Sequence, residues 1–133
     1  YEWRQTPKGR LAEIIVLDQF SRNIYRNQAR AFACDPLALS LAQEVVAQGI
    51  DKQFKPPHIG FLYLPYMHSE SIRIHEVAMQ LYSQPGLEDS LDFEIRHKEI
   101  LARFGRYPHR NKALGRPSTA EEIEFLKQPG SGF

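Results

Sequence analysis

Two stretches of the chain share one pattern of arginine, asparagine and phenylalanine, and each follows an apolar segment with helical periodicity. Residues 17–27 read LDQFSRNIYRN and residues 101–111 read LARFGRYPHRN, so both fit L-x-x-F-x-R-x-x-x-R-N. Guanidinium groups bind carboxylates and phosphates bidentately, asparagine adds neutral donors, and histidine adds a group that titrates near neutral pH. The pattern therefore predicts a shared polar pocket for an anionic group. Its candidate ligand-binding residues are Arg22, Asn23, Arg26, Arg103, Arg106, His109, Arg110 and Asn111.

The same arginines also have a structural interpretation. They lie at or just after the C-terminal ends of predicted helices, where a cation complements the negative end of the helix dipole. Pairing with Asp18 or Glu99 would make them locks at helix junctions, and Arg106→Ala or Asp18→Ala would then mainly lower stability. Local charge is compatible with both interpretations, because residues 96–116 hold seven Lys or Arg against one acid and are flanked by acidic segments.

Four further residues carry titratable groups suited to acid–base chemistry. These catalytic candidates are Asp18, His68, Glu70 and His97. In one pocket they would supply the acid and base of a hydrolase-like enzyme, with arginines holding a substrate carboxylate or phosphate. The triplet His68-Ser69-Glu70 is no catalytic triad, because consecutive residues rarely face one another. A shared buried pocket that holds His68, Glu70 and His97 within hydrogen-bond reach, with shifted pKa values, would favour the enzyme. If these residues lie scattered on separate surfaces, the enzyme hypothesis fails.

We expect neither a bound metal nor a cofactor. Glu94 and His97 have the Glu-x-x-His spacing of di-iron helical bundles, but those sites need a second such motif and this sequence has one copy. The sequence also lacks a His-Glu-x-x-His motif, a cysteine pair, a Walker loop and a G-x-G-x-x-G motif.

The composition is that of an ordinary globular domain. The chain has 133 residues, of which 42% are hydrophobic and 25% charged, with a net charge of +1, so no global field favours nucleic acid or membrane. The basic stretch contains Phe104 and Tyr107 but no recognised nucleic-acid-binding motif. The single cysteine, Cys34, fits a reducing compartment. Because no membrane-spanning run or signal peptide is visible, we expect a cytoplasmic protein.

Periodicity and capping signals predict an all-α chain. Thr6-Pro7 and Asp35-Pro36 mark helix starts, and Ser118 with Glu121 reads as a capping box. The expected helices cover residues 7–25, 36–48, 57–67, 71–84, 90–104 and 118–126. Short loops favour antiparallel neighbours. The prediction is a single all-helical domain over residues 1–133, built as a tetratricopeptide-like array or a compact bundle of about six antiparallel helices.

Three segments, in this order, resemble a bacterial family known as domain of unknown function 924. They are residues 17–26 (LDQFSRNIYR), 61–70 (FLYLPYMHSE) and 103–116 (RFGRYPHRNKALGR), and residues 118–126 (STAEEIEFL) also fit. The resemblance covers essentially the whole chain and implies a tetratricopeptide-like fold with no established activity. Family members usually have further residues ahead of the D-Q-F segment, including an aromatic-rich stretch of the D-F-W-F type that is not found in this sequence. The resemblance therefore also implies that an N-terminal part is missing. The polar pattern that it implies comprises Asp18, Gln19, Arg22, Asn23, Arg26, His68, Ser69, Glu70, His97, Arg103, Arg106, His109, Arg110 and Asn111.

The function that we expect is binding in a pocket lined by arginine, histidine and asparagine. Its partner would be an anionic small molecule, or a protein or peptide that offers an anionic group. In this hypothesis Arg22, Arg106 and Arg110 bind the anion, and Asn23 and Asn111 orient it. The hydrolase-like enzyme is the alternative, and the sequence leaves open whether the protein is catalytic. An apolar face exposed by a missing N-terminal part could also drive homo-oligomerisation.

Overall fold

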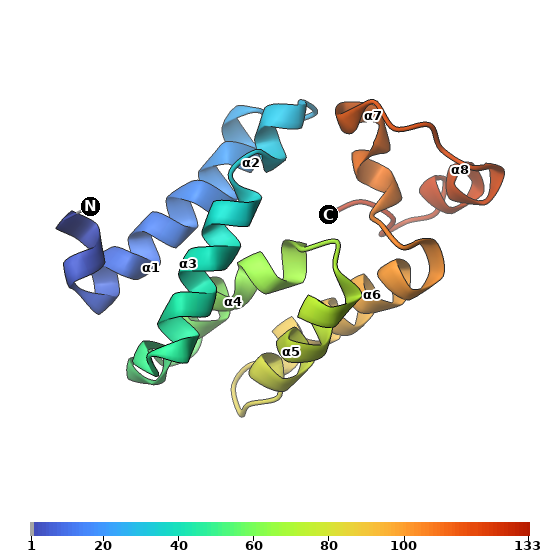
Figure 1. The fold of residues 1–133 in the computed structure, drawn as a ribbon. Helices are drawn as coiled ribbons and strands as arrows, with labels where there is room; N and C mark the ends of the chain where they lie inside the picture. The colour runs from blue at the N-terminus through green and yellow to red at the C-terminus, as the bar shows by residue number, and fades with distance from the viewer. Residues whose placement is uncertain (1) are drawn as a thin grey trace.

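The computed structural model describes residues 2–133, which form helices joined by short turns (Figure 1). The α-helices are α1 (Pro7–Ile15), α2 (Ser21–Ile24), α3 (Asp35–Ala47), α4 (His58–His68), α5 (Ile72–Tyr82), α6 (Glu88–Phe104), α7 (Asn111–Leu114) and α8 (Ala120–Leu126). The 3-10 turns are η1 (Glu2–Gln5), η3 (Ala29–Phe32), η4 (Ile50–Gln53) and η5 (Pro108–Arg110), and the π-helical turn η2 (Val16–Phe20) joins α1 to α2. No β-strand occurs in residues 2–133. The predicted all-α fold is confirmed as a compact helical structure, while its likeness to tetratricopeptide repeats stays a prediction.

The ends of the helices follow the local sequence signals in most places. Thr6 caps α1 by accepting a hydrogen bond from the backbone N–H of Gly9 at 3.0 Å, and Pro7 occupies the first turn. Gly49 and Gly105 follow α3 and α6 with φ of 71°, a left-handed conformation that glycine adopts without a steric penalty. The predicted stops after α3 and α6 are therefore confirmed.

The capping box of the last helix lies one residue later than predicted. Thr119, not Ser118, accepts a hydrogen bond from the backbone N–H of Glu122 at 3.1 Å, and Glu122 accepts one from the backbone N–H of Thr119 at 3.0 Å. Ser118 and Glu121 have the same spacing, so the pattern alone could not choose between the two registers. Ser118 instead accepts a hydrogen bond from Asn111.

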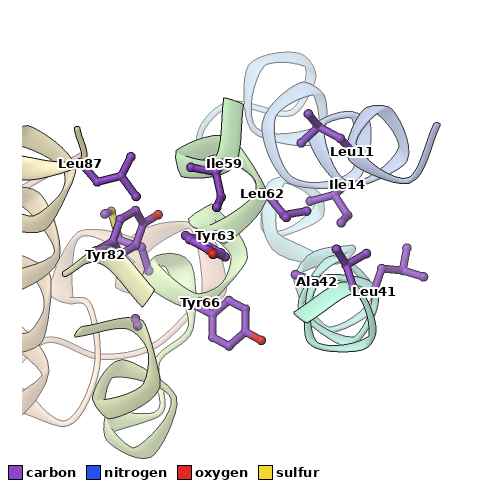
Figure 2. Packing of buried hydrophobic residues seen from close by; sticks show 13 residues of the cluster. Leu11, Ile14, Leu41, Ala42, Ile59, Leu62, Tyr63, Tyr66, Tyr82 and Leu87 are labelled. Atoms are coloured by element: carbon purple, nitrogen blue, oxygen red, sulfur yellow. The ribbon is translucent and has the colours of Figure 1, made fainter. Parts of the chain in front are cut away.

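The core lies around α4, which is apolar on nearly all sides. Leu62 and Tyr63 are fully buried, and they pack in one cluster with Ile14 of α1, Ala42 of α3 and Tyr82 of α5 (Figure 2). Burying such side chains contributes about 1.5–3 kcal/mol each. The helix expected over residues 57–67 is therefore confirmed as α4, and most of its side chains are buried.

Helices that follow one another in the sequence pack against one another, from α3 through α4 and α5 to α6. α1 lies against α3 and α4, and the C-terminal α7 lies near the end of α2 (Figure 1). This arrangement places His109 of the second echoing segment (residues 101–111) next to residues of the first (17–27). A bilayer-spanning helix is not found in residues 2–133, because none of the helices there is both long and apolar enough.

Candidate functional site

A π-helical turn, η2, places an acidic side chain in the interior. η2 interrupts the rod formed by α1 and α2, and Asp18 in its middle is only 1% exposed. π-Helical turns inside α-helices are rare and frequently occur at functional sites. A buried carboxylate is costly unless it is paired or hydrogen-bonded, so the partners of Asp18 define what this turn does.

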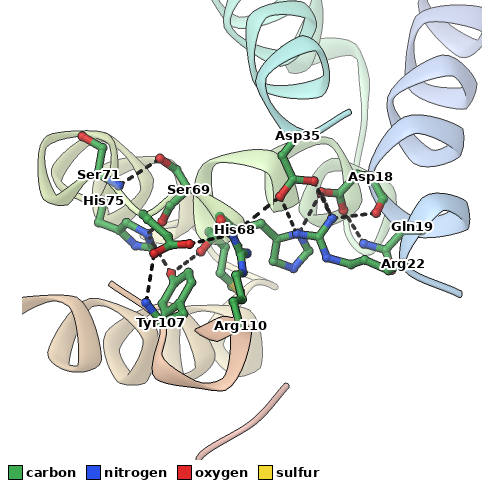
Figure 3. Close-up of polar contacts among 12 residues, drawn as sticks. Asp18, Gln19, Arg22, Asp35, His68, Ser69, Ser71, His75, Tyr107 and Arg110 are labelled. Atoms are coloured by element: carbon green, nitrogen blue, oxygen red, sulfur yellow. Dashed lines mark hydrogen bonds and ion pairs between the residues drawn. The ribbon is translucent and has the colours of Figure 1, made fainter. Parts of the chain in front are cut away.

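The main partner of Asp18 is His68, the last residue of α4. Nδ1 of His68 lies 2.7 Å from Oδ1 of Asp18 (Figure 3), and the side-chain amide of Gln19 also donates to the Asp18 carboxylate. Burial lowers the pKa of His68, and Arg22 and Arg110 act in the same direction against the opposing effect of Asp18. A neutral His68 therefore carries its proton on Nδ1, facing the carboxylate, and leaves Nε2 with a free lone pair.

Asp18 is the ionised member of this pair. Burial alone would raise the pKa of its carboxyl group, but His68, Arg22 and Gln19 together hold it below its usual value. Nε2 of His68 forms no hydrogen bond within residues 2–133. It is not one of the buried side-chain nitrogen or oxygen atoms of those residues that lack a hydrogen-bond partner, so it is at least partly exposed. The pair thus combines a fixed carboxylate with an accessible imidazole nitrogen.

Arg22 connects this pair to the next helix. Its Nη1 donates to the backbone carbonyl of Asp18 at 2.8 Å and to Oδ1 of the same residue at 3.2 Å. The guanidinium also binds Asp35, the first residue of α3, through two hydrogen bonds of 2.8 Å (Figure 3). Arg22 therefore connects α2 to α3. Its positive charge is already partly neutralised by the carboxylates of Asp18 and Asp35.

A cavity of about 370 Å³ opens beside Arg22, which forms part of its wall. Its lining residues are Gln19, Arg22, Asn23, Arg26, Asn27, Ala31, Phe32, His109, Ala113 and Phe133. Among the residues that the structure describes, Arg26 has no ion pair or side-chain hydrogen bond, and it is exposed. Within residues 2–133, Asn27 is the only non-glycine residue with a positive φ, at 64°. We call this space the arginine cavity.

His109 adds a neutral imidazole to the arginine cavity. Its Nδ1 is buried and has no hydrogen-bond partner within residues 2–133. Burial, together with Arg110 and Arg22, lowers the pKa of His109 to about 4, so the ring is uncharged at neutral pH. Phe133 lies against this ring with centroids 4.5 Å apart, and it lines the same cavity. The wall of the arginine cavity therefore combines cationic side chains, Arg22 and Arg26, with the aromatic ring of Phe133.

The arginines of the second echoing segment mostly bind carboxylates of the protein itself. Arg110 is 5% exposed, and it donates to the backbone carbonyl of His68 at 2.7 Å and to Glu70 at 3.3 Å. Arg116 also binds Glu70, at 2.9 and 3.2 Å, and the backbone N–H of Tyr107 donates to the same carboxylate. Arg110 and His68 also line a second cavity of about 360 Å³, which shares Phe32 with the arginine cavity.

Arg106 and Asn111 are also engaged in internal contacts. Arg106 binds Glu122 of α8 through hydrogen bonds of 2.9 and 2.7 Å, and Asn111 donates to the same carboxylate at 3.3 Å. These contacts lower the pKa of Glu122 to about 2, with the hydrogen bond from Arg106 as the largest cause. Neither residue lines the arginine cavity. Their geometry fits the structural interpretation, in which these residues hold helix ends together. A role in anion binding stays a prediction.

Arg103 lies apart from the other candidates. Its guanidinium stacks on Phe104 and Phe125 at 4.6 and 5.8 Å, and it lines a separate cavity of about 480 Å³ between α6 and α8. Arg103 therefore cannot act on a ligand of the arginine cavity, and any binding role belongs to this other face.

The four acid–base candidates do not form one pocket. Glu70 binds arginines, and His97 donates from Nδ1 to the backbone carbonyl of Phe93 at 2.6 Å and lies against the ring of Phe133, 3.6 Å between centroids. Burial lowers the pKa of His97 to about 3. The structure thus joins Asp18 directly to His68. Glu70 lines the second cavity with His68, but its carboxylate binds Arg110 and Arg116, and His97 lines neither this cavity nor the arginine cavity. Within residues 2–133, no group of three or more metal-ligating side chains clusters in a metal-binding arrangement.

Sequence reasoning did not find several residues of the site. Asp35 was interpreted only as a helix start, although it binds Arg22 through both carboxylate oxygens. Asn27 ends the first echoing segment, so its match to Asn111 was an available signal. Nothing in the sequence pointed to Phe32 or Phe133, because a lone aromatic residue in a turn carries no spacing pattern.

Comparison with known proteins gives a family but no activity. The model of the family described as "Bacterial protein of unknown function (DUF924)" matches residues 1–130 and by itself gives no support to the expected loss of an N-terminal part. The solved structure of the protein of unknown function ATU0120 from Agrobacterium tumefaciens is similar, with 36% identity and a TM-score of 0.87 over 95% of this chain and 71% of that chain. No curated protein gives a significant match. The chain belongs to the DUF924 family of bacterial proteins of unknown function.

Proposed function

We propose that the protein binds a small anionic ligand, a carboxylate or a phosphate on a compact organic body, in the arginine cavity. The observation that carries the proposal is Arg26, an exposed guanidinium in the cavity wall without an ion pair or hydrogen bond in residues 2–133. Such a group offers its full fork of donors to a carboxylate or phosphate. Arg22 stands beside it with two carboxylates already bound, so Arg26 is the main anion-binding group.

The rest of the cavity supports a ligand with a polar end and an apolar body. Asn23, Asn27 and Gln19 supply amides next to Arg26, while Phe32 and Phe133 supply ring faces. A volume of about 370 Å³ is near the lower end of small-molecule sites, which span about 300–1,000 Å³. This size favours a small molecule over a peptide segment. The single Cys34 continues to support a reducing compartment, so we propose that the ligand is met in the cytoplasm.

Calorimetric titration with inorganic phosphate, succinate and phenyl phosphate tests this proposal. We expect the protein to bind at least one of them, and Arg26→Ala to weaken that binding by about tenfold or more, because it removes a charge-assisted contact. Arg73→Ala is the matched control, since Arg73 is an exposed arginine of α5 that lines none of the described cavities. The control should bind like the parent.

Two results would contradict the proposal. One is no measurable binding of any of the three anions at low ionic strength. The other is an equal loss of affinity in Arg26→Ala and Arg73→Ala, which would indicate attraction by the general charge of the protein. Thermal unfolding of both variants should match the parent, because both arginines are exposed and neither has an ion pair or a side-chain hydrogen bond within residues 2–133.

A further inference from the structure

Several side chains hold the Asp18–His68 pair in a fixed geometry, which simple ligand binding does not require. A carboxylate that is 1% exposed sits in a π-helical turn, and three side chains, Gln19, Arg22 and His68, point their donors at it. The imidazole is held by its Nδ1 from the last residue of α4. Histidines that act as bases are commonly oriented in this way, with a carboxylate on one nitrogen and the other nitrogen free.

The pair also has a defined position relative to the arginine cavity. Arg22 and Gln19 line that cavity and both bind Asp18. His68 lines the second cavity, and Phe32 forms part of the wall of both. To reach His68, a ligand whose anionic end lies at Arg26 would have to extend past Phe32 into the second cavity.

We propose that His68 is a general base, positioned by Asp18, that hydrolyses an ester bond in the anionic ligand held by Arg26. This inference rests on the proposed function, because it uses the same cavity to place the substrate. His68 is the catalytic residue, since its Nε2 would touch the attacking water. Asp18 is a positioning residue, which acts through the imidazole.

The chemistry uses water as the nucleophile. No serine, threonine or cysteine side chain is hydrogen-bonded to His68 in residues 2–133. Nε2 of His68 takes one proton from water while the water oxygen bonds to the ester carbonyl carbon. The bond from that carbon to the alkoxy oxygen then breaks, and the imidazolium returns the proton to the leaving oxygen. The products are a carboxylic acid and an alcohol, and the enzyme regains its neutral His68.

The probe reaction is hydrolysis of the mono-4-nitrophenyl ester of succinic acid, followed by release of nitrophenol. The matched neutral probe is 4-nitrophenyl butyrate, which lacks the carboxylate. The free carboxylate of the anionic ester attacks its own ester bond in water, so this spontaneous release is measured without protein and subtracted. We expect faster protein-dependent turnover of the anionic ester at equal concentration. His68→Gln should lower kcat by about 100-fold or more, which is the usual contribution of a general base. His58→Gln is the control, because His58 is an exposed histidine at the other end of α4.

Further variants separate the two roles and the two proposals. Arg26→Ala should raise KM with little change in kcat. Asp18→Asn should lower kcat and move the acidic limb of the pH profile to lower pH, since the imidazolium loses its carboxylate. The other charged groups that act on His68 are Arg22 and Arg110, and both remain in this variant. A merely structural role of Asp18 would leave the position of the limb unchanged.

The state of the imidazole can be observed without any ligand. In ¹⁵N NMR at pH 7, His68 should be neutral and protonated on Nδ1. A charged ring, or a proton on Nε2, would overturn the proposal, as would equal hydrolysis by the parent and His68→Gln. If succinate binds through Arg26 but its nitrophenyl ester is not hydrolysed, the base role is wrong and the binding function stands. If the anions do not bind at all, the proposed function is wrong as well.

Discussion

The two echoing segments have the same pattern and nearly opposite environments. In residues 17–27 the second arginine, Arg26, is exposed at a cavity wall without an ion pair in residues 2–133. The matching residue in 101–111 is Arg110, which is 5% exposed and binds Glu70 and a backbone carbonyl. The asparagines differ likewise: Asn27 is exposed, whereas Asn111 is buried and binds Glu122.

The difference teaches that acids outside the pattern decide what its arginines do. Glu70 comes from the turn between α4 and α5, and Glu122 comes from α8, so neither carboxylate belongs to an echoing segment. Where such an acid is present, as at Arg110, the arginine stabilises the fold. At Arg26 none of the residues 2–133 supplies an acid, which is why we propose that its charge serves a ligand. The same motif therefore stabilises the fold in one place and, in our proposal, binds a ligand in the other.

Replacing the matched arginines gives the largest expected contrast. Arg110→Ala should lower the free energy of unfolding by about 3 kcal/mol, near the lower end for breaking a buried pair, because Arg116 still binds Glu70. Arg26→Ala should change it by less than about 0.5 kcal/mol, as expected for an exposed residue. Urea denaturation of the two variants measures this difference. Equal losses would show that the two segments are structurally equivalent after all.

Lowering the pH should reduce the free energy of unfolding through His97, a buried histidine near the second echoing segment. In the folded protein His97 has a pKa of about 3, below the value of 6.5 expected in the unfolded chain, so the unfolded chain binds the proton first as the pH falls. Stability is therefore lost from about pH 6.5 downward, by roughly 2–3 kcal/mol from His97 at pH 4.5. His97→Gln should remove this part of the pH dependence in urea denaturation, and the exposed-site variant His58→Gln should keep it.

Tyr107 offers a smaller test of the second segment as a support. Its hydroxyl donates to the backbone carbonyl of Met67 at 2.6 Å and lies 3.0 Å from Nε2 of His75. Tyr107→Phe leaves that buried carbonyl without this donor and should lower the free energy of unfolding by about 1–2 kcal/mol. Thermal unfolding would measure the loss. A variant as stable as the parent would mean that water replaces the hydroxyl.

The smallest expected effect on stability belongs to Asn27. Its φ of 64° lies in the left-handed region, which glycine occupies without a steric penalty. Asn27→Gly should change the free energy of unfolding by less than about 0.5 kcal/mol while weakening binding of phosphate or succinate, because an amide of the cavity wall is lost. Calorimetric titration and urea denaturation together test this. A clear stability loss with unchanged affinity would assign Asn27 to the fold.

Most of the fold was predictable because its signals are local. A Thr-Pro start, glycine stops and apolar periodicity depend on a few neighbouring residues. They located the start of α1 and both ends of α3 and α6 within a few residues, whereas the helix expected over residues 7–25 is divided into α1, η2 and α2. The capping box was misplaced by one position because Ser118 and Thr119 both have a glutamate three residues later. The π-helical turn was not predicted, since neither propensity nor periodicity separates five such residues from ordinary α-helix.

The site was predictable in its residue types but not in its partners. Arg22, Arg26, Asn23 and His109 were chosen by type and do line one cavity. Whether an arginine is free or paired depends on which distant acid the fold brings to it, and the pairing of Arg106 with Glu122 is of that kind. For the same reason, the sequence could nominate Asp18 and His68 together with Glu70 and His97 but could not show that only the first two meet.

The π-helical turn makes the phase of this rod depend on the number of residues in it as well as on their types. An α-helical residue advances the helix by about 100°, and the five residues of the wider π-turn, Val16–Phe20, advance it by about as much as four α-helical residues. Deleting one residue from this turn would therefore restore α geometry and leave Arg22 facing Asp35. A homologue with one residue fewer here would keep the tie between α2 and α3 and differ within the turn itself, where Asp18 lies.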